Sequence, residues 1–123
     1  MARSRNSAKQ AGARFERNTA DWLRDNVSEW IDRKVKTGAA DKGDIANVRT
    51  HNNERVVVEC KDYGGRLEAG TWIKEAETER VNDEAIAGIV VAKRKGTTDP
   101  GDQYVITTLR DFTAILTGVR PPK

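Results

Sequence analysis

The hydrophobic pattern of this sequence changes its period near residue 30, and the change limits the folds open to the chain. Before that point, Phe15, Thr19, Trp22 and Leu23 recur at three- and four-residue steps, as on one face of an amphipathic helix. After it, apolar and charged residues alternate, as in a strand. The sequence therefore predicts a chain that combines helices with a sheet.

The same analysis along the whole chain predicts the element order αβββαββα. The expected elements are a helix over 9–27, strands over 31–37, 44–50 and 55–61, a helix over 67–83, strands over 87–93 and 103–107, and a helix over 109–116. Ser7 is expected to cap the first helix. The short turn at 51–54 predicts a hairpin, and the helix over 67–83 predicts a parallel crossover. The expected class is α/β, with a mixed (α+β) sheet and helices on both of its faces.

The length of 123 residues suits one domain. We expect residues 1–8 to form a flexible basic arm, residues 9–118 to form the domain, and residues 119–123 to form a short basic tail. No apolar run is long enough to cross a membrane, and no apolar stretch follows the basic N-terminus as in a secretory signal. We therefore expect a cytoplasmic protein without membrane partners.

The sequence contains one cysteine, Cys60, and one histidine, His51. This composition excludes an intramolecular disulfide framework, a cysteine-rich zinc site and any site that needs paired histidines.

Basic residues are distributed unevenly. The chain has 22 Lys and Arg against 19 Asp and Glu, a net charge of +3, and its first fifteen residues carry no acid. A second basic cluster follows the strand expected over 87–93, and a third ends the chain. Separated basic clusters suit a polyanion such as DNA, but a solvated surface gives the same pattern. Charge alone leaves both interpretations open.

The residues that point to chemistry are Asp44, Glu59 and Lys61. If Thr50 pairs with Arg55 in the hairpin, Asp44 lies opposite Lys61, and all three side chains project from one side of the sheet. The alternating residues of the same strand, Val56, Val58 and Cys60, then point to the other side. A slip by one residue would displace Asp44 but would leave Glu59 and Lys61 on a common face.

Two carboxylates beside a lysine suit a hard cation such as Mg²⁺, which takes carboxylate oxygens and leaves positions for water and phosphate. Lys61 would orient or help deprotonate a water and stabilise charge on the phosphate. Glu16, from the first helix, would give a third carboxylate if that helix covers this face. The alternative is structural, because Glu-x-Lys in a strand is also a common cross-strand ion pair, and Asp44 also suits a turn.

The segments Lys42-Gly43-Asp44-Ile45 and Val56-Val57-Val58-Glu59-Cys60-Lys61, after a helix that carries Glu16, resemble the PD-(D/E)XK nuclease superfamily. The resemblance covers about residues 10–95 and implies a restriction-endonuclease-like αβββαβ core. Gly12-Ala13-Arg14-Phe15-Glu16, Lys36-Thr37-Gly38 and the Lys-Gly-Asp loop are most similar to archaeal-type and phage-encoded Holliday junction resolvases.

This resemblance implies roles for individual residues. Glu16, Asp44, Glu59 and the backbone carbonyl of Cys60 would bind Mg²⁺, with Mn²⁺ as a substitute, and Lys61 would be the catalytic lysine. Gly43 stands where the family often has Pro, a change that we expect to be tolerated. The candidate DNA-binding residues are Arg3, Arg5, Lys9, Arg14, Arg33, Lys36, Lys42, Lys93 and Lys95.

The expected function is a metal-dependent endodeoxyribonuclease that cuts branched DNA, above all four-way junctions, as a homodimer. Two alternatives remain open at this stage. The first is a repair or restriction-type nuclease that acts on duplex or flap DNA. The second is a nucleic-acid-binding module without catalysis.

Overall fold

The computed structural model describes residues 4–35 and 43–123. The elements are α1 (Arg5–Asn26), β1 (Asp32–Arg33), β2 (Ile45–Ala46), β3 (Val56–Lys61), α2 (Ala69–Asn82), β4 (Ala87–Ala92), the 3₁₀ turn η1 (Pro100–Asp102), β5 (Tyr104–Ile106) and α3 (Leu109–Thr117). The order of helices and strands is the one that the sequence predicts. Within the described residues, no helix is long and apolar enough to cross a membrane.

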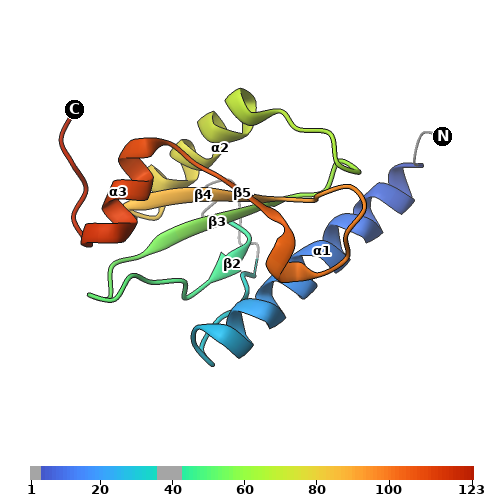
Figure 1. Cartoon of the computed structure of the whole chain (residues 1–123), viewed down its shortest axis with the longest axis horizontal. Helices are drawn as coiled ribbons and strands as arrows, with labels where there is room; N and C mark the ends of the chain where they lie inside the picture. Colours follow the sequence, from blue (N-terminus) through green and yellow to red (C-terminus); the bar gives the residue numbers. More distant parts are fainter. Residues whose placement is uncertain (1–3, 36–42) are drawn as a thin grey trace.

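One mixed sheet forms the centre of the molecule (Figure 1). Its five strands follow the order β1-β2-β3-β4-β5. Among the strands of the described residues, β3 and β4 run parallel, with α2 as the crossover that joins them, as predicted, and the other neighbours are antiparallel. The longest strands, β3 and β4, therefore lie in the middle, and their carboxyl ends meet at the same edge of the sheet.

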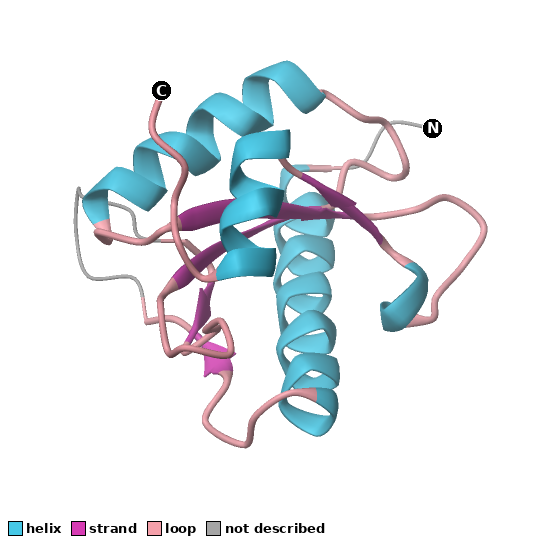
Figure 2. Cartoon of the chain, turned by 60° about the vertical axis from the view of Figure 1, so that its left-hand side comes forward, coloured by secondary structure: helices cyan, strands magenta, loops and turns pink. Residues whose placement is uncertain are grey.

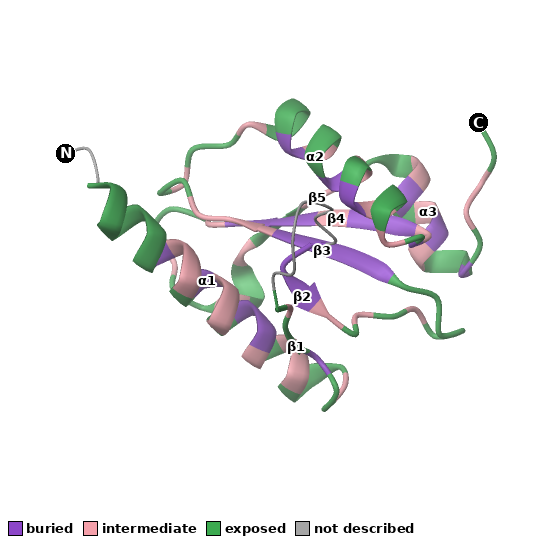
Figure 3. Ribbon diagram, turned by 180° about the vertical axis from the view of Figure 1, so that it is seen from behind, coloured by how far each residue is buried: buried purple, intermediate pink, exposed green. Residues whose placement is uncertain are grey.

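Helices cover both faces of the sheet, as expected (Figure 2). Phe15 and Ala20 of α1 pack on Val58 and Val91. Trp72 and Ala76 of α2 pack on Val90 and Ala92 of the opposite face. The third helix, α3, packs through Ala114 against Val56 and Ala87, at the end where β3 and β4 begin. Figure 3 shows the result, with β3 and β4 largely buried between helices whose outer sides are exposed.

The first helix begins earlier than the sequence predicts. Its N-cap is Ser4, whose hydroxyl accepts a hydrogen bond from the N–H of Ser7 at 3.1 Å. Ser7 is therefore a donor inside the first turn and does not cap the helix. Residues 5–8, which we expected in a flexible arm, are helical.

The second strand is shorter than predicted, and the hairpin register differs. The first strand ends at Arg33, and residues 36–37 of its predicted range lie outside the described residues. Ile45 pairs with Val58, whereas Arg49 pairs with Arg55, so the β2 side contains one more residue than the β3 side between these pairs. Asn47, at φ 67°, lies within this bulge. The pairing of Thr50 with Arg55, and hence of Asp44 with Lys61, is therefore wrong.

The C-terminal segment is held against the domain. The Arg120 guanidinium donates to the carbonyl of Ile86 at 2.9 Å and to Asp111 at 2.8 Å. It also lies 3.4 Å from Glu77 of α2. Arg120, which we expected in a basic tail, is thus neutralised within the molecule.

Candidate active site

The carboxyl end of β3 carries two charged side chains toward α2. The Lys61 ammonium lies 3.5 Å from Glu59 and 2.6 Å from Glu75 of α2. Glu59 is buried, with 7% of its surface exposed. Val58 and Cys60 pack on the α1 side. The predicted division of β3 into an apolar side and a charged side is therefore confirmed.

Asp44 lies at the edge of β3, beside Val58 and Cys60 and not opposite Lys61. Its backbone N–H donates to the carbonyl of Val58 at 2.8 Å, and its carboxylate accepts from the N–H of Cys60 at 2.8 Å. The carboxylate thus occupies the place where a longer β2 would continue the ladder. Asp44 is 2% exposed, so this carboxylate is fixed inside the protein.

Gly43 allows this close approach of Asp44 to β3. Its φ is +97°, and a Cβ at this position would lie 2.9 Å from a methyl group of Val57 and 3.1 Å from the carbonyl oxygen of Val58. Proline has φ near −65°, so it cannot adopt this conformation. The Gly43-for-Pro difference from the nuclease pattern therefore has a structural meaning: the chain reaches Asp44 along a path that Pro could not follow.

The charges of three carboxylates act on Cys60. Burial raises the pKa of the Cys60 thiol well above its ordinary value, and the charges of Asp44, Glu16 and Glu59 raise it further against a hydrogen bond with Thr19. The N–H and C=O of one strand residue point to the same side, so the Cys60 carbonyl faces the edge where Asp44 lies. The backbone of Cys60 thus faces the Asp44 carboxylate, one of the predicted metal ligands.

Glu16 approaches from the other side of the sheet. Its helix, α1, packs on the apolar face, and Arg33 of β1 lies 3.2 Å from its carboxylate. The expectation that α1 covers the face of Glu59 and Lys61 is therefore wrong. Across residues 4–35 and 43–123, no three His, Cys, Asp or Glu side chains converge closely enough to hold a metal ion.

Opposing effects act on the protonation of Lys61. Burial lowers the pKa of Lys61, but the hydrogen bond with Glu75 and the charges of Glu59 and Glu75 raise it by more, so that it lies above its ordinary value. In this arrangement Lys61 is a cation, which favours charge stabilisation over proton abstraction.

Glu75 is the residue of this cluster that our sequence analysis did not assign. Its position between Trp72 and Ala76, which pack on the sheet, could have indicated that it faces the sheet. Residues three and four apart share a helix face, so a carboxylate at 75 is directed toward the strand that α2 covers.

The candidate DNA-binding residues divide into three groups. Arg5, Lys9, Arg14 and Lys95 are exposed. Arg33 pairs with Glu16, and the Lys93 ammonium donates to the carbonyls of Arg94 and Thr97. Arg33 and Lys93 therefore have partners within the protein. Arg3, Lys36 and Lys42 lie outside the described residues.

We compared the chain with protein-family models, curated proteins and solved structures, and none of them matches it.

Proposed function

We propose that the chain is a metal-dependent endodeoxyribonuclease of the PD-(D/E)XK type, with a restriction-endonuclease-like core. The observation that carries this proposal is the grouping of Asp44, Glu59 and Lys61 around the end of β3. Two of these charged groups, Asp44 and Glu59, are buried carboxylates less than a tenth exposed. Against the effect of burial, its carboxylate partners raise the pKa of the neighbouring Lys61, and clustered ionisable groups with a shifted pKa among them are typical of catalytic sites.

A divalent cation fits the donor set of this site. Mg²⁺ is commonly bound through one or two carboxylates, with water and substrate phosphate completing its coordination, so Asp44, Glu59 and the Cys60 carbonyl would be sufficient. Glu16 would join them if its pair with Arg33 opened. When bound, such an ion polarises a phosphodiester and lowers the pKa of a bound water. Mn²⁺ offers the same preference for oxygen ligands.

The protein's own contribution would come from Lys61 and from the rigid placement of the carboxylates. The Lys61 ammonium lies within reach of Glu59, so it would stand beside a phosphate bound at that carboxylate and stabilise its developing negative charge. The hydrogen bond from Cys60 to Asp44 would keep that carboxylate aimed at the same place through each turnover.

The substrate that we propose is branched DNA, in particular a four-way junction. The test is cleavage of an immobile junction in Mg²⁺ beside linear duplex and flap DNA of the same sequence, with Asp44→Ala as the control. We expect paired, symmetric cuts in the junction that disappear in Asp44→Ala. Equal cutting of duplex or flap DNA would retain the nuclease and refute the junction preference. Junction binding without any cutting would favour the binding module.

Symmetric cutting of a junction requires two active sites, and we propose that a second copy of the chain supplies the other one. An exposed apolar stripe on α3 favours this arrangement: Leu109, Phe112 and Leu116 are 79%, 49% and 63% exposed. Their spacing places them on one side of the helix, with no charge among them. A two-fold axis would pair this stripe with itself and form the apolar centre of an interface of about 800 Å² per partner.

Sedimentation equilibrium tests this surface without reference to cutting. We expect the unaltered chain to be a dimer and the double variant Leu109→Glu, Leu116→Glu to be a monomer. Val81→Glu, at an exposed apolar residue of α2, is the matched control and should remain dimeric. A monomeric unaltered chain, or a dimeric double variant, would exclude α3 as the interface.

A further inference from the structure

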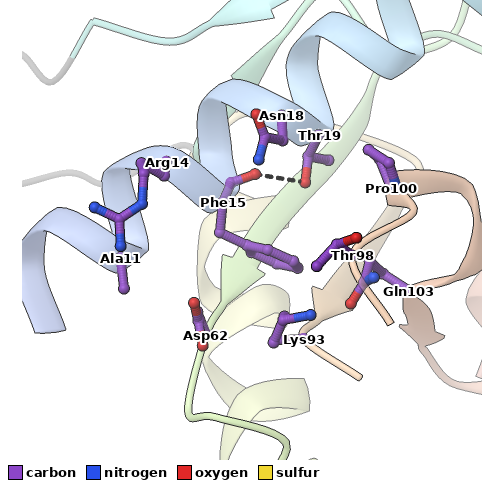
Figure 4. Close-up of a pocket in the computed structure, with 10 residues that line it drawn as sticks. All are labelled: Ala11, Arg14, Phe15, Asn18, Thr19, Asp62, Lys93, Thr98, Pro100 and Gln103. Carbon is purple, nitrogen blue, oxygen red and sulfur yellow. Dashed lines mark hydrogen bonds between the residues drawn. The ribbon is translucent and has the colours of Figure 1, made fainter. Parts of the chain in front are cut away.

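A cleft of about 320 Å³ lies between α1 and the loop that joins β4 to β5. Figure 4 shows the side chains that line it: Phe15 extends from α1 toward Thr98 of the loop, whereas Arg14 lies farther along α1, beside Ala11. Asp62 stands at the strand end of the cleft. The cleft lies on the side of the sheet that α1 covers, so it is separate from the pairing of Lys61 with Glu75.

The loop wall of the cleft is held in place by its own hydrogen bonds. The Gln103 amide donates to the carbonyls of Thr97 and Asp99 at 3.2 and 2.9 Å and accepts from the N–H of Arg94 at 2.7 Å. Lys93 donates to the carbonyl of Thr97 from the other side. A wall fixed in this way needs little ordering when a ligand enters, so less binding energy is lost to conformational entropy.

The lining of the cleft suits a nucleotide. Pro100 and the small part of Phe15 that is exposed, 7% of its surface, provide apolar surface for a base, and the Asn18 amide and the Thr98 hydroxyl offer donors and acceptors for its edge. Arg14, exposed on α1, provides a guanidinium for the phosphate that follows. Small-ligand clefts range from about 300 to 1,000 Å³, so this one has room for a single nucleotide and not for a helical segment.

The position of the cleft connects it to the proposed site of cutting. Lys61 and Asp62 are consecutive, and consecutive Cα atoms lie about 3.8 Å apart. Lys61 turns toward Glu75 of α2, whereas Asp62 lines the cleft on the α1 side. A strand of DNA at Lys61 would therefore pass the mouth of the cleft with its neighbouring nucleotide.

We propose that this cleft binds one unpaired nucleotide of the DNA beside the bond that is cut. The inference rests on the proposed nuclease function and adds to it a basis for substrate choice. A paired base would have to leave its stack to enter the cleft, at a cost of a few kcal/mol, which is smallest where the base is already unpaired. Flaps, gaps and junctions with open branch points would therefore bind better than linear duplex.

The test measures binding in EDTA, so that no cutting is needed. The probes are flap DNA with 2-aminopurine as the first unpaired base and a linear duplex of the same sequence. We expect the chain to raise the 2-aminopurine fluorescence, because the base leaves the stack of its neighbours. Thr98→Trp, which fills the cleft, should lower the affinity for the flap at least tenfold and leave that for the duplex unchanged.

Two matched controls keep this test specific. Thr78→Trp is the control for Thr98→Trp, because it places the same side chain on the exposed side of α2. Asn26→Ala is the control for Asn18→Ala, because it makes the same change at the far end of α1. We expect Asn18→Ala to weaken flap binding and both controls to retain it. Equal flap binding by Thr98→Trp and Thr78→Trp would refute the cleft, whereas absence of Asp44-dependent cutting would refute only the nuclease.

Discussion

The two sides of β3 have the same length and are both covered by a helix, yet they carry different chemistry. One side presents Val58 and Cys60 to α1 and Val56 to α3, and Val58 is completely buried. Toward α2 the strand ends in Glu59 and Lys61, with Glu59 almost as well buried. The difference between the sides is therefore one of charge and not of solvent access.

Only the α1 side is explained by stability. Full burial of a valine contributes about 1.5–3 kcal/mol to folding. Burial of a carboxylate and an ammonium costs several kcal/mol per ion, and their pairing at 3.5 Å and the contact of Lys61 with Glu75 at 2.6 Å offset this cost without turning it into a large gain. Apolar residues at 59 and 61 would serve the fold as well, which favours a functional reason for the charges.

The largest expected effect is on the charged side. In Lys61→Ala, cutting of junction DNA should fall by about 100- to 1,000-fold, because the positive charge beside the phosphate is lost. Metal binding should persist, since Asp44 and Glu59 remain. Single-turnover cleavage and calorimetric Mn²⁺ titration measure the two quantities, and Lys74→Ala, an exposed lysine of α2, is the control. Undiminished cutting by Lys61→Ala would remove Lys61 from the site.

The apolar side should respond in stability. Val58→Ala removes two methyl groups from a position that has no exposed surface, so the free energy of unfolding should fall by about 2 kcal/mol. Urea denaturation measures the loss, and Val81→Ala, with 58% of Val81 exposed, should change it little. If both variants lost the same amount, the packing of β3 on α1 would be wrong.

The next prediction concerns Gly43, which allows Asp44 to lie close to β3. Gly43→Ala should lower stability by about 1–3 kcal/mol, because the backbone has φ +97° and the new Cβ meets Val57 and Val58. Gly12→Ala is the matched control: nothing lies within 4 Å of its Cβ in α1, so it should be neutral or stabilising. The same urea titration serves both variants, and a neutral Gly43→Ala would contradict the approach of Asp44 to β3.

The smallest effect concerns charges that are exposed. The hydrogen bond from Arg17, with that from the N–H of Arg33, lowers the pKa of Asp32 below its ordinary value. A lowered folded pKa stabilises the protein above the unfolded pKa, and this contribution is lost as the pH falls through the folded value. Asp32→Asn should therefore be slightly less stable than the unaltered chain at neutral pH and equal to it in acid. If the stability difference between Asp32→Asn and the unaltered chain grew on acidification, this prediction would be contradicted.

The sequence was sufficient where a period alone decides the structure. The alternation of Val56, Val58 and Cys60 with Glu59 and Lys61 fixes which residues share a side of β3, and no shift of the hairpin changes it. The helix between the strands expected over 55–61 and 87–93 predicted a parallel crossover, and β3 and β4 do run parallel. These features depend on local spacing, which a single sequence contains.

The rest depends on contacts between distant segments. The hairpin pairs Arg49, and not Thr50, with Arg55. The extra residue near Asn47 shifts the register by one more, so Asp44 lies beside Cys60 and not opposite Lys61. The side taken by α1 depends on how Phe15 packs, because the spacing of a helix does not say which face of a sheet it will cover. Glu16 was therefore expected on the wrong side, although its charge still reaches Cys60.

The most direct test of the charged side is Glu59→Gln, with stability and cutting measured on the same preparation. Lys61 keeps Glu75 as a partner in this variant, so the free energy of unfolding should rise or fall by less than about 1 kcal/mol. Cutting of junction DNA in Mg²⁺ should fall at least about 100-fold. Glu54→Gln, in the exposed turn before β3, should change neither. A variant that unfolds readily, or one that still cuts, would show that Glu59 serves the fold and not a reaction.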